Sequence, residues 1–568
     1  MHNRKEIGYN PIQYRTPVTE LMDGWQFSLD GKVWRPIRVP YAPQTKLSGI
    51  GYRDFIPKCR YKKEFTCEKT DKRVILHFGA VDYETNVYVN GVHVGSHRGG
   101  YTPFFFDITD QVTDAQNLLE LEVFDDYKNV PSGKQSAERE TFGCFYSRTT
   151  GIWQPVWIEY VPEVHIEKFR FYPNIKDTAV RVELALAGRG EYSVEVFFEG
   201  RTVGYAKGVA GGNISVNISL LERHLWSVGQ GNLYDVVLKF GGDVVHSYFG
   251  LREVAYRGFE FLLNGERIFQ KLVLEQGYYA DGGYTPRDLD AMQKDIDFAA
   301  ELGFNGLRLH QKVFDPRYLY LCDKAGMMVW AEFPSWGIDY TNTESLPVFL
   351  AEWERAMERD FNHPCIILWC PLNEVWGGQD KTAKRDIKYI DEVYSFTKTY
   401  DSTRPCVDVS GGHHGHETDL YDFHSYEPPE VLEGYLKKLE LEGELQVPLL
   451  YSEDEKELRY RDGLPVHISE FGGIALGDCD GKVAAVNECA VACKENWGYG
   501  KSALDEEEFV KRYEAYVSVI FGCRKLSGFC YTQLYDIEQE CNGFRTYERK
   551  DKLSRNCIDR IRAINSAK

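Results

Sequence analysis

Two glutamates in this chain each close a run of apolar residues. Glu374 follows the segment CIILWCPLN, and Glu470 follows LPVHIS. An acidic side chain at the end of a buried strand is costly unless it has partners or a function. Two carboxylates across a pocket can cleave a glycosidic bond, because one stays protonated to assist the leaving group while the other is ionised and attacks the anomeric carbon. Their separation, roughly 5–5.5 Å for retention and roughly 6.5–9.5 Å for inversion, is not readable from sequence.

Apolar stretches of strand length alternate with amphipathic stretches from about residue 265 onward. The predicted strands are Lys271–Glu275, Asn305–Leu309, Met327–Glu332, Ile366–Leu372, Pro405–Val409, Leu420–His424, Val466–Glu470 and Gly528–Gln533. The predicted helices include Pro286–Leu302, Pro316–Ala325, Leu350–Phe361 and Glu506–Ile520. Buried strands that are each followed by a helix or long loop indicate a C-terminal (β/α)8 TIM barrel, which we place at residues 257–568.

The preceding part of the chain is rich in short strands. Residues 1–163 show alternating runs and the turn Asn90–Gly91, a strong hairpin signal, and predict an antiparallel β-sandwich. Residues 164–256 predict a second, immunoglobulin-like β-sandwich. Its expected strands, separated by glycine-rich turns, are Ala179–Leu186, Tyr192–Phe198, Ile214–Ile218 and Tyr234–Lys239.

Composition limits the partners and the compartment. The 568 residues carry a net charge of −19, which argues against a nucleic-acid or anionic-membrane partner. We expect no membrane span and no secretory signal, because no apolar run approaches 18 residues and Met1 to Thr16 is polar. Several of the 14 cysteines lie within apolar runs, which indicates free thiols and a reducing cytoplasm. No Cys/His spacing typical of zinc occurs, so we expect neither a metal nor a cofactor.

Active sites of such barrels lie at the C-terminal ends of the strands. Besides the two glutamates, the predicted strand ends place these polar side chains there: Arg308, His310, Glu332, Asn373, His424, Tyr426 and Gln533. A salt bridge at the barrel mouth would explain any single acid. Two acids with Asn, Arg, His and Tyr on neighbouring strand ends favour catalysis.

Five motifs, in order along nearly the whole chain, carry a resemblance to a known family. They are TTGIWQPVWIE (149–159), GFNGLRLH (303–310), LCDKAGMMVWAE (321–332), ILWCPLNE (367–374) and SEFGG (469–473). With these motifs the chain resembles glycoside hydrolase family 2, the β-galactosidase, β-glucuronidase and β-mannosidase family. The resemblance implies an N-terminal jelly roll, an immunoglobulin-like sandwich and the barrel. It also implies retention, with Glu374 as acid/base and Glu470 as nucleophile.

The resemblance also suggests roles for the neighbouring strand ends. Asn373 resembles the family residue that binds the sugar 2-hydroxyl, a bond that strengthens as charge develops at the anomeric carbon. Arg308 would hold the nucleophile ionised or form a structural ion pair, and we expect Glu332 to be its structural partner. His424 and Tyr426 would bind the nucleophile or a sugar hydroxyl, or pack in the core.

Three positions depart from the family pattern. Where the β-galactosidases keep a histidine, this chain has Gln311, with His310 one residue earlier, and which of the two faces the pocket stays open. Thr532 replaces the strand-8 tryptophan that forms the sugar platform, so Tyr531, Tyr535 or Trp497 would have to supply it.

The third departure lies in the Asn-x-Lys motif that binds the substrate carboxylate in β-glucuronidases. Here it reads Asn542, Gly543, Phe544, with Arg545 as the adjacent cation that could pair with a uronic acid. In the unusual loop after the first barrel strand, Asp281 is the side chain best suited to a sugar hydroxyl.

The sequence therefore predicts a retaining exo-β-glycosidase that acts on terminal non-reducing sugars, with β-galactosides as the first candidate. The alternatives are a β-glucuronidase or uronidase and a non-catalytic carbohydrate-binding protein on the same fold. The expected partner is a carbohydrate or glycoside. A homo-oligomer is possible, because the sandwich domains often mediate assembly in this family.

Overall fold

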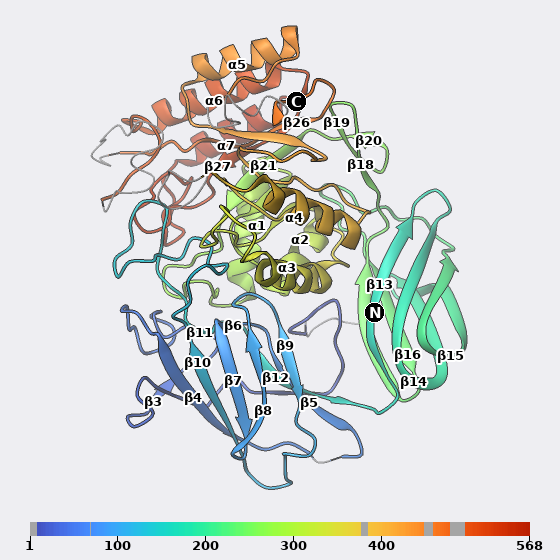
Figure 1. Ribbon diagram of the computed structural model, residues 1–568. Helices are drawn as coiled ribbons and strands as arrows, with labels where there is room; N and C mark the ends of the chain where they lie inside the picture. The colour runs from blue at the N-terminus through green and yellow to red at the C-terminus, as the bar shows by residue number, and fades with distance from the viewer. Residues whose placement is uncertain (1–7, 69, 376–383, 448–457, 478–494) are drawn as a thin grey trace.

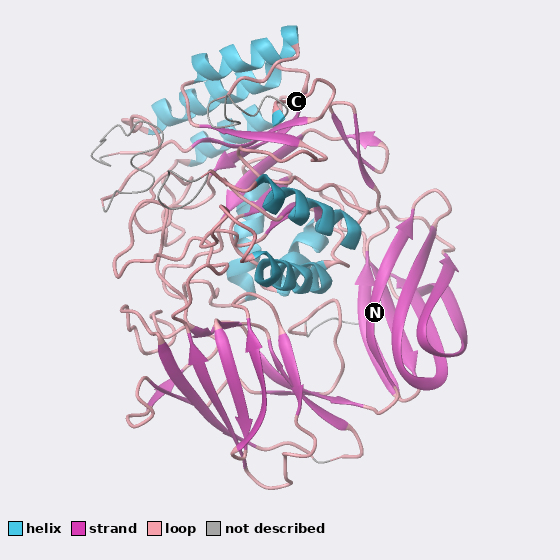
Figure 2. Cartoon of the chain, in the orientation of Figure 1, coloured by secondary structure: helices cyan, strands magenta, loops and turns pink. Residues whose placement is uncertain are grey.

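The computed structural model describes residues 8–68, 70–375, 384–447, 458–477 and 495–568. Two β-rich units lie beside a barrel that carries all the helices of the described chain (Figure 1, Figure 2). Each of the three units has its own cluster of buried apolar side chains, as expected for a multidomain chain of this length. The predicted three-part architecture is confirmed.

The first unit is an antiparallel sandwich of two main sheets, in strand orders β1-β12-β5-β9 and β3-β2-β4-β10-β7-β8. Asn90 and Gly91, with φ of 52° and 80°, form the predicted tight turn between β7 and β8. The strands are β1 Val18–Glu20, β2 Trp25–Ser28, β3 Arg35–Ile37, β4 Lys58–Phe65, β5 Arg73–Phe78, β6 Val81–Asp82, β7 Glu84–Val89, β8 Val92–Arg98, β9 Phe104–Asp107, β10 Asn117–Phe124, β11 Gly151–Ile152 and β12 Val156–Val161.

The second unit is built around two long strands. Its strands are β13 His165–Asn174, β14 Ala179–Phe198, β15 Arg201–Ser219, β16 Tyr234–Phe240 and β17 Asp243–Phe249. The glycine-rich turn predicted between Leu186 and Tyr192 is wrong, because β14 runs straight through it and only shifts register between Leu186 and Arg189. The first half of β14 pairs with β13 and the second half with β16, so one strand serves both parts of the sandwich.

A short antiparallel sheet and then a parallel sheet form the third unit. The antiparallel strands are β18 Val254–Arg257, β19 Glu260–Leu263 and β20 Glu266–Arg267. The 7-stranded parallel sheet has the order β24-β23-β22-β21-β27-β26-β25. Its strands are β21 Gln270–Glu275, β22 Gly306–Leu309, β23 Met328–Glu332, β24 Ile366–Cys370, β25 Tyr421–Ser425, β26 Val466–Gly472 and β27 Leu526–Thr532.

The predicted fifth barrel strand, Pro405–Val409, is not a regular strand. Residues 405–410 touch β24 and its continuation only through the isolated parallel bridges Trp369–Cys406 and Asn373–Ser410. On the other side, the carboxylate of Asp422 in β25 accepts hydrogen bonds from Ser410 Oγ and the Gly411 N–H. The segment thus lies between the two edge strands of the sheet. It is joined to β24 and the residues after it by isolated backbone hydrogen bonds, and to β25 by the Asp422 side chain.

Helices follow most of the barrel strands. They are α1 Leu289–Glu301, α2 Pro316–Ala325, α3 Leu346–Asp360, α4 Ile387–Tyr400, α5 Pro429–Glu442, α6 Glu506–Gly522 and α7 Arg555–Asn565. Sequence signals explain several ends. The side chains of Asp288 and Asp505 cap the first turns of α1 and α6, and Gly326, with φ of 65°, ends α2 in the left-handed conformation. No helix of the described ranges is long and apolar enough to cross a membrane.

Both sandwiches bind the barrel through buried polar contacts. Tyr83 of the first unit donates a 2.6 Å hydrogen bond to Glu352 in α3. Tyr248 of the second unit donates a 2.8 Å bond to Asp323 in α2. These contacts fix the sandwiches against the barrel, so that loops of the first unit can reach the barrel mouth.

Candidate active site

Glu374, Glu470 and His424 meet at the C-terminal ends of the parallel strands. One carboxylate oxygen of each glutamate and one ring nitrogen of His424 all lie within 4.8 Å of one another. His424 Nδ1 is 2.6 Å from Glu374 Oε1, and His424 Nε2 is 3.5 Å from Glu470 Oε1. The two acids predicted from separate motifs therefore form one cluster, at a separation that suits the retaining arrangement of carboxyl groups.

Arg308 at the end of β22 holds this cluster together. Its guanidinium is fully buried and lies 2.8 Å from Glu470 Oε1 and 2.8 Å from Glu332 Oε2, which confirms the predicted Glu332 pairing. A third branch donates a 2.6 Å hydrogen bond to Asn373 Oδ1. The planar fork of an arginine can serve all three acceptors at once, whereas a lysine ammonium could not match this geometry.

The second oxygen of Glu470 has its own donor. Tyr426 donates a short hydrogen bond from its hydroxyl to Glu470 Oε2, and the same hydroxyl lies 3.1 Å from Thr532 Oγ1. The Tyr426 ring stacks on Tyr499 at a centroid separation of 3.4 Å. Burial, followed by the charge of Glu470, raises the pKa of the Tyr426 hydroxyl far above its usual value, so it stays a donor.

The surrounding charges favour an ionised Glu470. Burial alone would raise the pKa of its carboxyl, but the positive charges of His424 and Arg308 lower that pKa below its usual range. The converse holds for His424, where burial lowers the pKa but Glu470 and Glu374 raise it above its usual value. These charges therefore keep Glu470 ionised, and the carboxylate is the form that can attack an electrophilic carbon.

Glu374 adopts an uncommon backbone conformation. Its φ is 48°, in the left-handed region that residues with a side chain rarely occupy. Its N–H donates a 2.8 Å hydrogen bond to the Ser410 carbonyl oxygen, so the irregular segment 405–410 fixes this conformation. Such strain persists only where the surroundings impose it, and it is frequent at functional sites.

The Asn373 amide has one free donor. Because Arg308 only donates, Oδ1 of Asn373 must face the guanidinium and its Nδ2 must face the other way. Nδ2 is buried and has no hydrogen-bond partner among the described residues. On the backbone side, Trp336 donates a 3.0 Å indole hydrogen bond to the Asn373 carbonyl oxygen. Asn373 is thus held rigidly with an unused donor, which suits recognition of a hydroxyl group.

His310 and Gln311 point in different directions. His310 Nδ1 lies 3.0 Å from Glu332 Oε1, and burial followed by the charges of Lys134 and Arg308 lowers its pKa well below the usual value. Gln311 instead donates to Ser335 Oγ at 3.1 Å. His310 is therefore the neutral imidazole on the side of the charged cluster, and Gln311 supports the loop after β23.

A loop of the first sandwich reaches the barrel mouth and contributes residues that sequence reasoning missed. The N–H groups of Ser132 and Gly133 donate to the Trp336 carbonyl oxygen at 2.8 and 3.1 Å. A Cβ at Gly133, whose φ is 59°, would lie 2.4 Å from the Gln311 carbonyl oxygen, so this close approach requires glycine. The loop thereby brings Lys134 over the Trp336 ring, 4.0 Å from its centroid.

Gln533 and Asn542 belong to a series of side-chain hydrogen bonds beside this loop. Gln533 donates a 2.8 Å hydrogen bond to Asn542, and Asn542 donates a 3.0 Å bond to Glu540. Tyr146 of the first sandwich donates a short bond to the other oxygen of Glu540. Both predicted residues are buried, and they link the barrel to the sandwich loop.

Other predicted residues lie elsewhere. Trp497 is buried and donates its indole N–H to the Gly143 carbonyl oxygen at 2.9 Å, so it anchors the sandwich loop. Tyr499, two residues further along, stacks on Tyr426 and so lies next to the carboxylate cluster. Asp281 is half-buried and pairs with Arg287.

Arg545, the alternative cation for a uronic acid, also lies outside the cluster. It pairs with Asp551 at 2.7 Å and stacks over the Phe298 ring. It lines an outer cavity whose described lining includes neither Glu374 nor Glu470.

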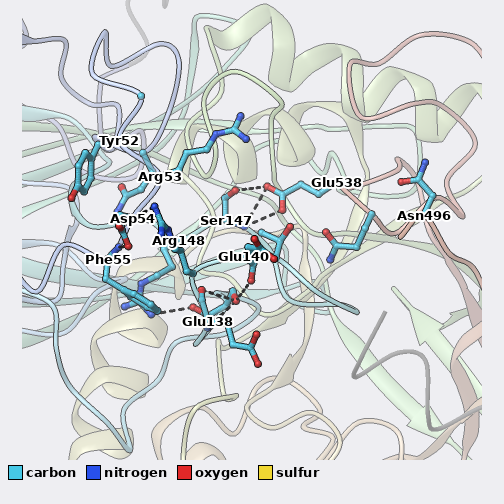
Figure 3. Close-up of a pocket in the computed structure, with 16 residues that line it drawn as sticks. Tyr52, Arg53, Asp54, Phe55, Glu138, Glu140, Ser147, Arg148, Asn496 and Glu538 are labelled. Carbon is cyan, nitrogen blue, oxygen red and sulfur yellow. Dashed lines mark hydrogen bonds and ion pairs between the residues drawn. The ribbon is translucent and has the colours of Figure 1, made fainter. Parts of the chain in front are cut away.

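A cavity of about 750 Å³ opens where the first sandwich meets the barrel loops (Figure 3). Tyr52 and Phe55 line one part of it, and Glu538 receives hydrogen bonds from Ser147 across it. Its described lining includes neither Glu374 nor Glu470. It is therefore distinct from the carboxylate cluster.

Within the described ranges, two groups of side chains bring potential metal-ligand atoms close together. One is the cluster of Glu374, His424 and Glu470, and the other is the buried set Asp323, His363 and Cys365. In the second set, His363 lies 2.6 Å from the Asp323 carboxylate, which also accepts the Cys365 N–H. These atoms already satisfy one another, so their arrangement is explained without an ion.

The chain combines a barrel, two neighbouring carboxylates bound to a common arginine network, and two β-sandwiches. This combination is typical of a glycoside hydrolase. Three family models match in order: the glycosyl hydrolases family 2 sugar binding domain at residues 27–156, the family 2 domain at 164–252, and the family 2 TIM barrel domain at 254–464. The chain belongs to glycoside hydrolase family 2.

Known proteins are similar over different shares of the chain. A β-galactosidase of Thermoanaerobacter pseudethanolicus is 27% identical over 378 residues, covering 62% of this chain and 49% of that protein. A β-glucuronidase of Canis lupus familiaris is 26% identical over 65% of this chain and 61% of its own length. The chain thus spans about half the length of the β-galactosidase it matches.

The fold also has solved counterparts. A β-glucuronidase from an uncultured Clostridium sp. superposes with a TM-score of 0.78 at 20% identity, covering 98% of both chains. At that identity the likeness concerns the arrangement of the three units.

Proposed function

We propose that the chain hydrolyses terminal β-glycosides with retention of configuration. The observation that carries this proposal is the cluster in which carboxylate oxygens of Glu374 and Glu470 lie within 4.8 Å of each other. That separation leaves no room for a water molecule between an inverting base and the sugar, whereas it suits direct attack by a carboxylate.

Glu470 is the nucleophile of this proposal. Arg308 and Tyr426 each bind one of its oxygens and keep it ionised and oriented. It attacks the anomeric carbon, and a covalent glycosyl–enzyme ester forms as the glycosidic bond breaks. Both donors remain in place when the ester is hydrolysed and the carboxylate returns.

Glu374 supplies and recovers the proton. It protonates the glycosidic oxygen as the bond breaks, and its carboxylate then takes a proton from the water that attacks the ester. His424 lies 2.6 Å from Glu374 and 3.5 Å from Glu470 and so connects the two side chains. The free Nδ2 of Asn373 is the donor for a sugar hydroxyl next to the reacting carbon.

The comparisons support two sugars. Curated relatives include β-galactosidases, the first candidate from sequence, and β-glucuronidases. The loop from the first sandwich is bound to Trp336 and Glu540 beside the strand ends. We propose exo-acting cleavage of a terminal sugar, because the relatives named above are β-galactosidases and β-glucuronidases.

The test is a panel of aryl β-glycosides that differ only in the sugar, followed by NMR of the first-formed product anomer. We expect turnover of at least one member with the β-anomer released first. Release of the α-anomer would reject retention. Binding of sugars without turnover of any member would favour the non-catalytic alternative.

A further inference from the structure

Lys134 is a buried cation at the barrel mouth that comes from the first sandwich. Its side chain is 7% exposed, and its ammonium lies over the Trp336 ring at 4.0 Å from the centroid. Trp336 in turn binds the Asn373 carbonyl oxygen through its indole N–H. The lysine is therefore separated from the Asn373–Glu374 segment by a single ring.

Lys134 has no ion-pair partner among the described residues. No described carboxylate oxygen lies within 4.0 Å of its ammonium, and no hydrogen bond of that ammonium to an oxygen is found there. The Cys144 thiol is its sulfur neighbour, and a thiol is a weak acceptor. The ammonium is therefore held near carboxylates without a direct ion pair, and its N–H donors are not taken up by a described oxygen.

The nearby carboxylates are already engaged. Burial lowers the pKa of Lys134, whereas Cys144 and then Glu540, Glu470 and Glu374 raise it to a value above the ordinary one. Each of these glutamates has its own partner, however. Glu470 is held by an arginine and a tyrosine, Glu540 by a tyrosine and an asparagine, and one oxygen of Glu374 by a histidine. The lysine keeps its charge, and its ammonium lies beside Trp336 without a described oxygen partner.

The backbone around Lys134 makes the position rigid. Its carbonyl oxygen accepts a 2.8 Å hydrogen bond from the Tyr146 N–H, and the preceding Gly133 is bound to Trp336. Gln539 fixes the later part of the loop by donating to the carbonyl oxygens of Gly143 and Phe145 at 2.6 and 3.1 Å. A cation that is held in place before the ligand arrives binds an anionic oxygen with little loss of entropy.

We propose that Lys134 is a specificity-determining residue that binds an anionic group carried by the sugar, so that the chain prefers acidic β-glycosides. This inference rests on the proposed glycosidase function and names its substrate class. The recognised chemistry is an oxyanion, either the carboxylate of a hexuronic acid or a sulfate ester on a hexose. A neutral hydroxyl could accept one hydrogen bond, whereas a carboxylate or sulfate oxygen would accept a stronger, charge-assisted one.

The experiment compares kcat/KM of the full chain on four 4-nitrophenyl β-glycosides: the galactoside, the glucuronide, the galacturonide and the 6-sulfogalactoside. The variants are Lys134→Gln, Lys134→Arg and the control Lys128→Gln, which removes an exposed lysine near the start of the same loop. We expect the wild type to prefer an acidic substrate, and Lys134→Gln to lower kcat/KM for it by about 10- to 100-fold relative to the neutral galactoside. The acidic substrate whose kcat/KM falls in Lys134→Gln shows whether the ligand of Lys134 is a carboxylate or a sulfate.

Several results would overturn the proposal. A wild type that prefers the neutral galactoside contradicts it directly. An equal loss on all substrates in Lys134→Gln would show that Lys134 acts on Glu470 and not on the sugar. Lys134→Arg keeps the charge and checks folding, because it should retain the acidic preference while Lys134→Gln loses it.

A chain that cleaves none of the substrates would reject the proposed function without deciding the role of Lys134. Calorimetric binding of D-glucuronate, D-galacturonate and galactose 6-sulfate then decides it. Binding of one of these anions by the wild type that disappears in Lys134→Gln supports the proposal, and binding that is absent or unchanged rejects it.

Discussion

Arg308 and Glu470 form a buried ion pair, with the guanidinium 2.8 Å from the carboxylate oxygen Oε1. The pair joins the ends of β22 and β26 across the barrel. Removing one member of a buried pair leaves the other charge uncompensated, which costs more than the pair itself contributes. The pair therefore controls both the stability of the barrel mouth and the charge state of the proposed nucleophile.

The first prediction concerns Arg308→Lys. A lysine keeps the charge but cannot serve Glu470, Glu332 and Asn373 together, so we expect kcat/KM to fall about 100-fold or more. The pKa of Glu470 should rise toward its usual value, and the acidic limb of the kcat/KM profile should move to higher pH. A pH–rate profile measures both, and an unmoved acidic limb would show that Arg308 does not hold Glu470 ionised.

A second prediction separates the two glutamates by leaving group. Glu374→Gln removes the proton donor, so kcat/KM should fall about 10²- to 10⁴-fold on alkyl glycosides, which need acid assistance. It should fall much less on activated aryl glycosides, whose leaving groups depart without a proton. Equal losses on both kinds of substrate would contradict an acid/base role for Glu374.

Tyr426→Phe provides a third prediction. It removes the hydroxyl that binds Glu470 Oε2 and keeps the ring that stacks on Tyr499. We expect kcat/KM to fall about 10- to 100-fold, as for loss of one hydrogen bond to a charged group, with little change in Tm. Steady-state kinetics and thermal unfolding check this. Full activity in the variant would show that the Tyr426 hydroxyl does not assist Glu470.

The fourth prediction concerns pH and the contact between the first sandwich and the barrel. Burial raises the pKa of Glu352, which accepts the Tyr83 bond, to about 7. A raised carboxyl pKa gives stability that is complete below the unfolded value and is lost as pH rises through about 7.

Between pH 5 and 8 the wild type should therefore lose up to about 3 kcal/mol of unfolding free energy that Glu352→Gln does not lose. Denaturant unfolding of both proteins across this range measures how the unfolding free energy of each depends on pH. Parallel pH dependences would show that Glu352 is not protonated in the folded protein.

Much of the barrel was predictable because its signal is local. Most apolar strands and helices, such as β22 and α2, form where hydrophobic period and capping residues indicate. The segment Pro405–Val409 has the same apolar character but forms no regular ladder. Its backbone bonds to β24 are isolated, and the two residues after it bind β25 through the Asp422 carboxylate. The glycine-rich stretch around Gly188 and Gly190 predicted a turn, yet β14 continues through it, with a register shift at Gly188 and regular pairing at Gly190.

The site was predictable only in part for a related reason. Strand-end residues such as Arg308 and Tyr426 are fixed by their place on the barrel, so the strand pattern locates them. Lys134 and Trp336 come to Asn373, beside the cluster, from a sandwich loop and a barrel loop. Nothing in their local sequence indicates which distant strand ends they face, since that depends on how the domains dock.

The most direct test of the central claim traps the covalent intermediate. In Glu374→Ala, an activated aryl β-glycoside should still glycosylate the enzyme, while the missing base slows hydrolysis of the ester. Intact mass followed by peptide mapping should show one sugar residue attached, on the peptide that contains Glu470. An adduct on another residue, or turnover of the aryl glycoside without any adduct and with inversion, would contradict the account.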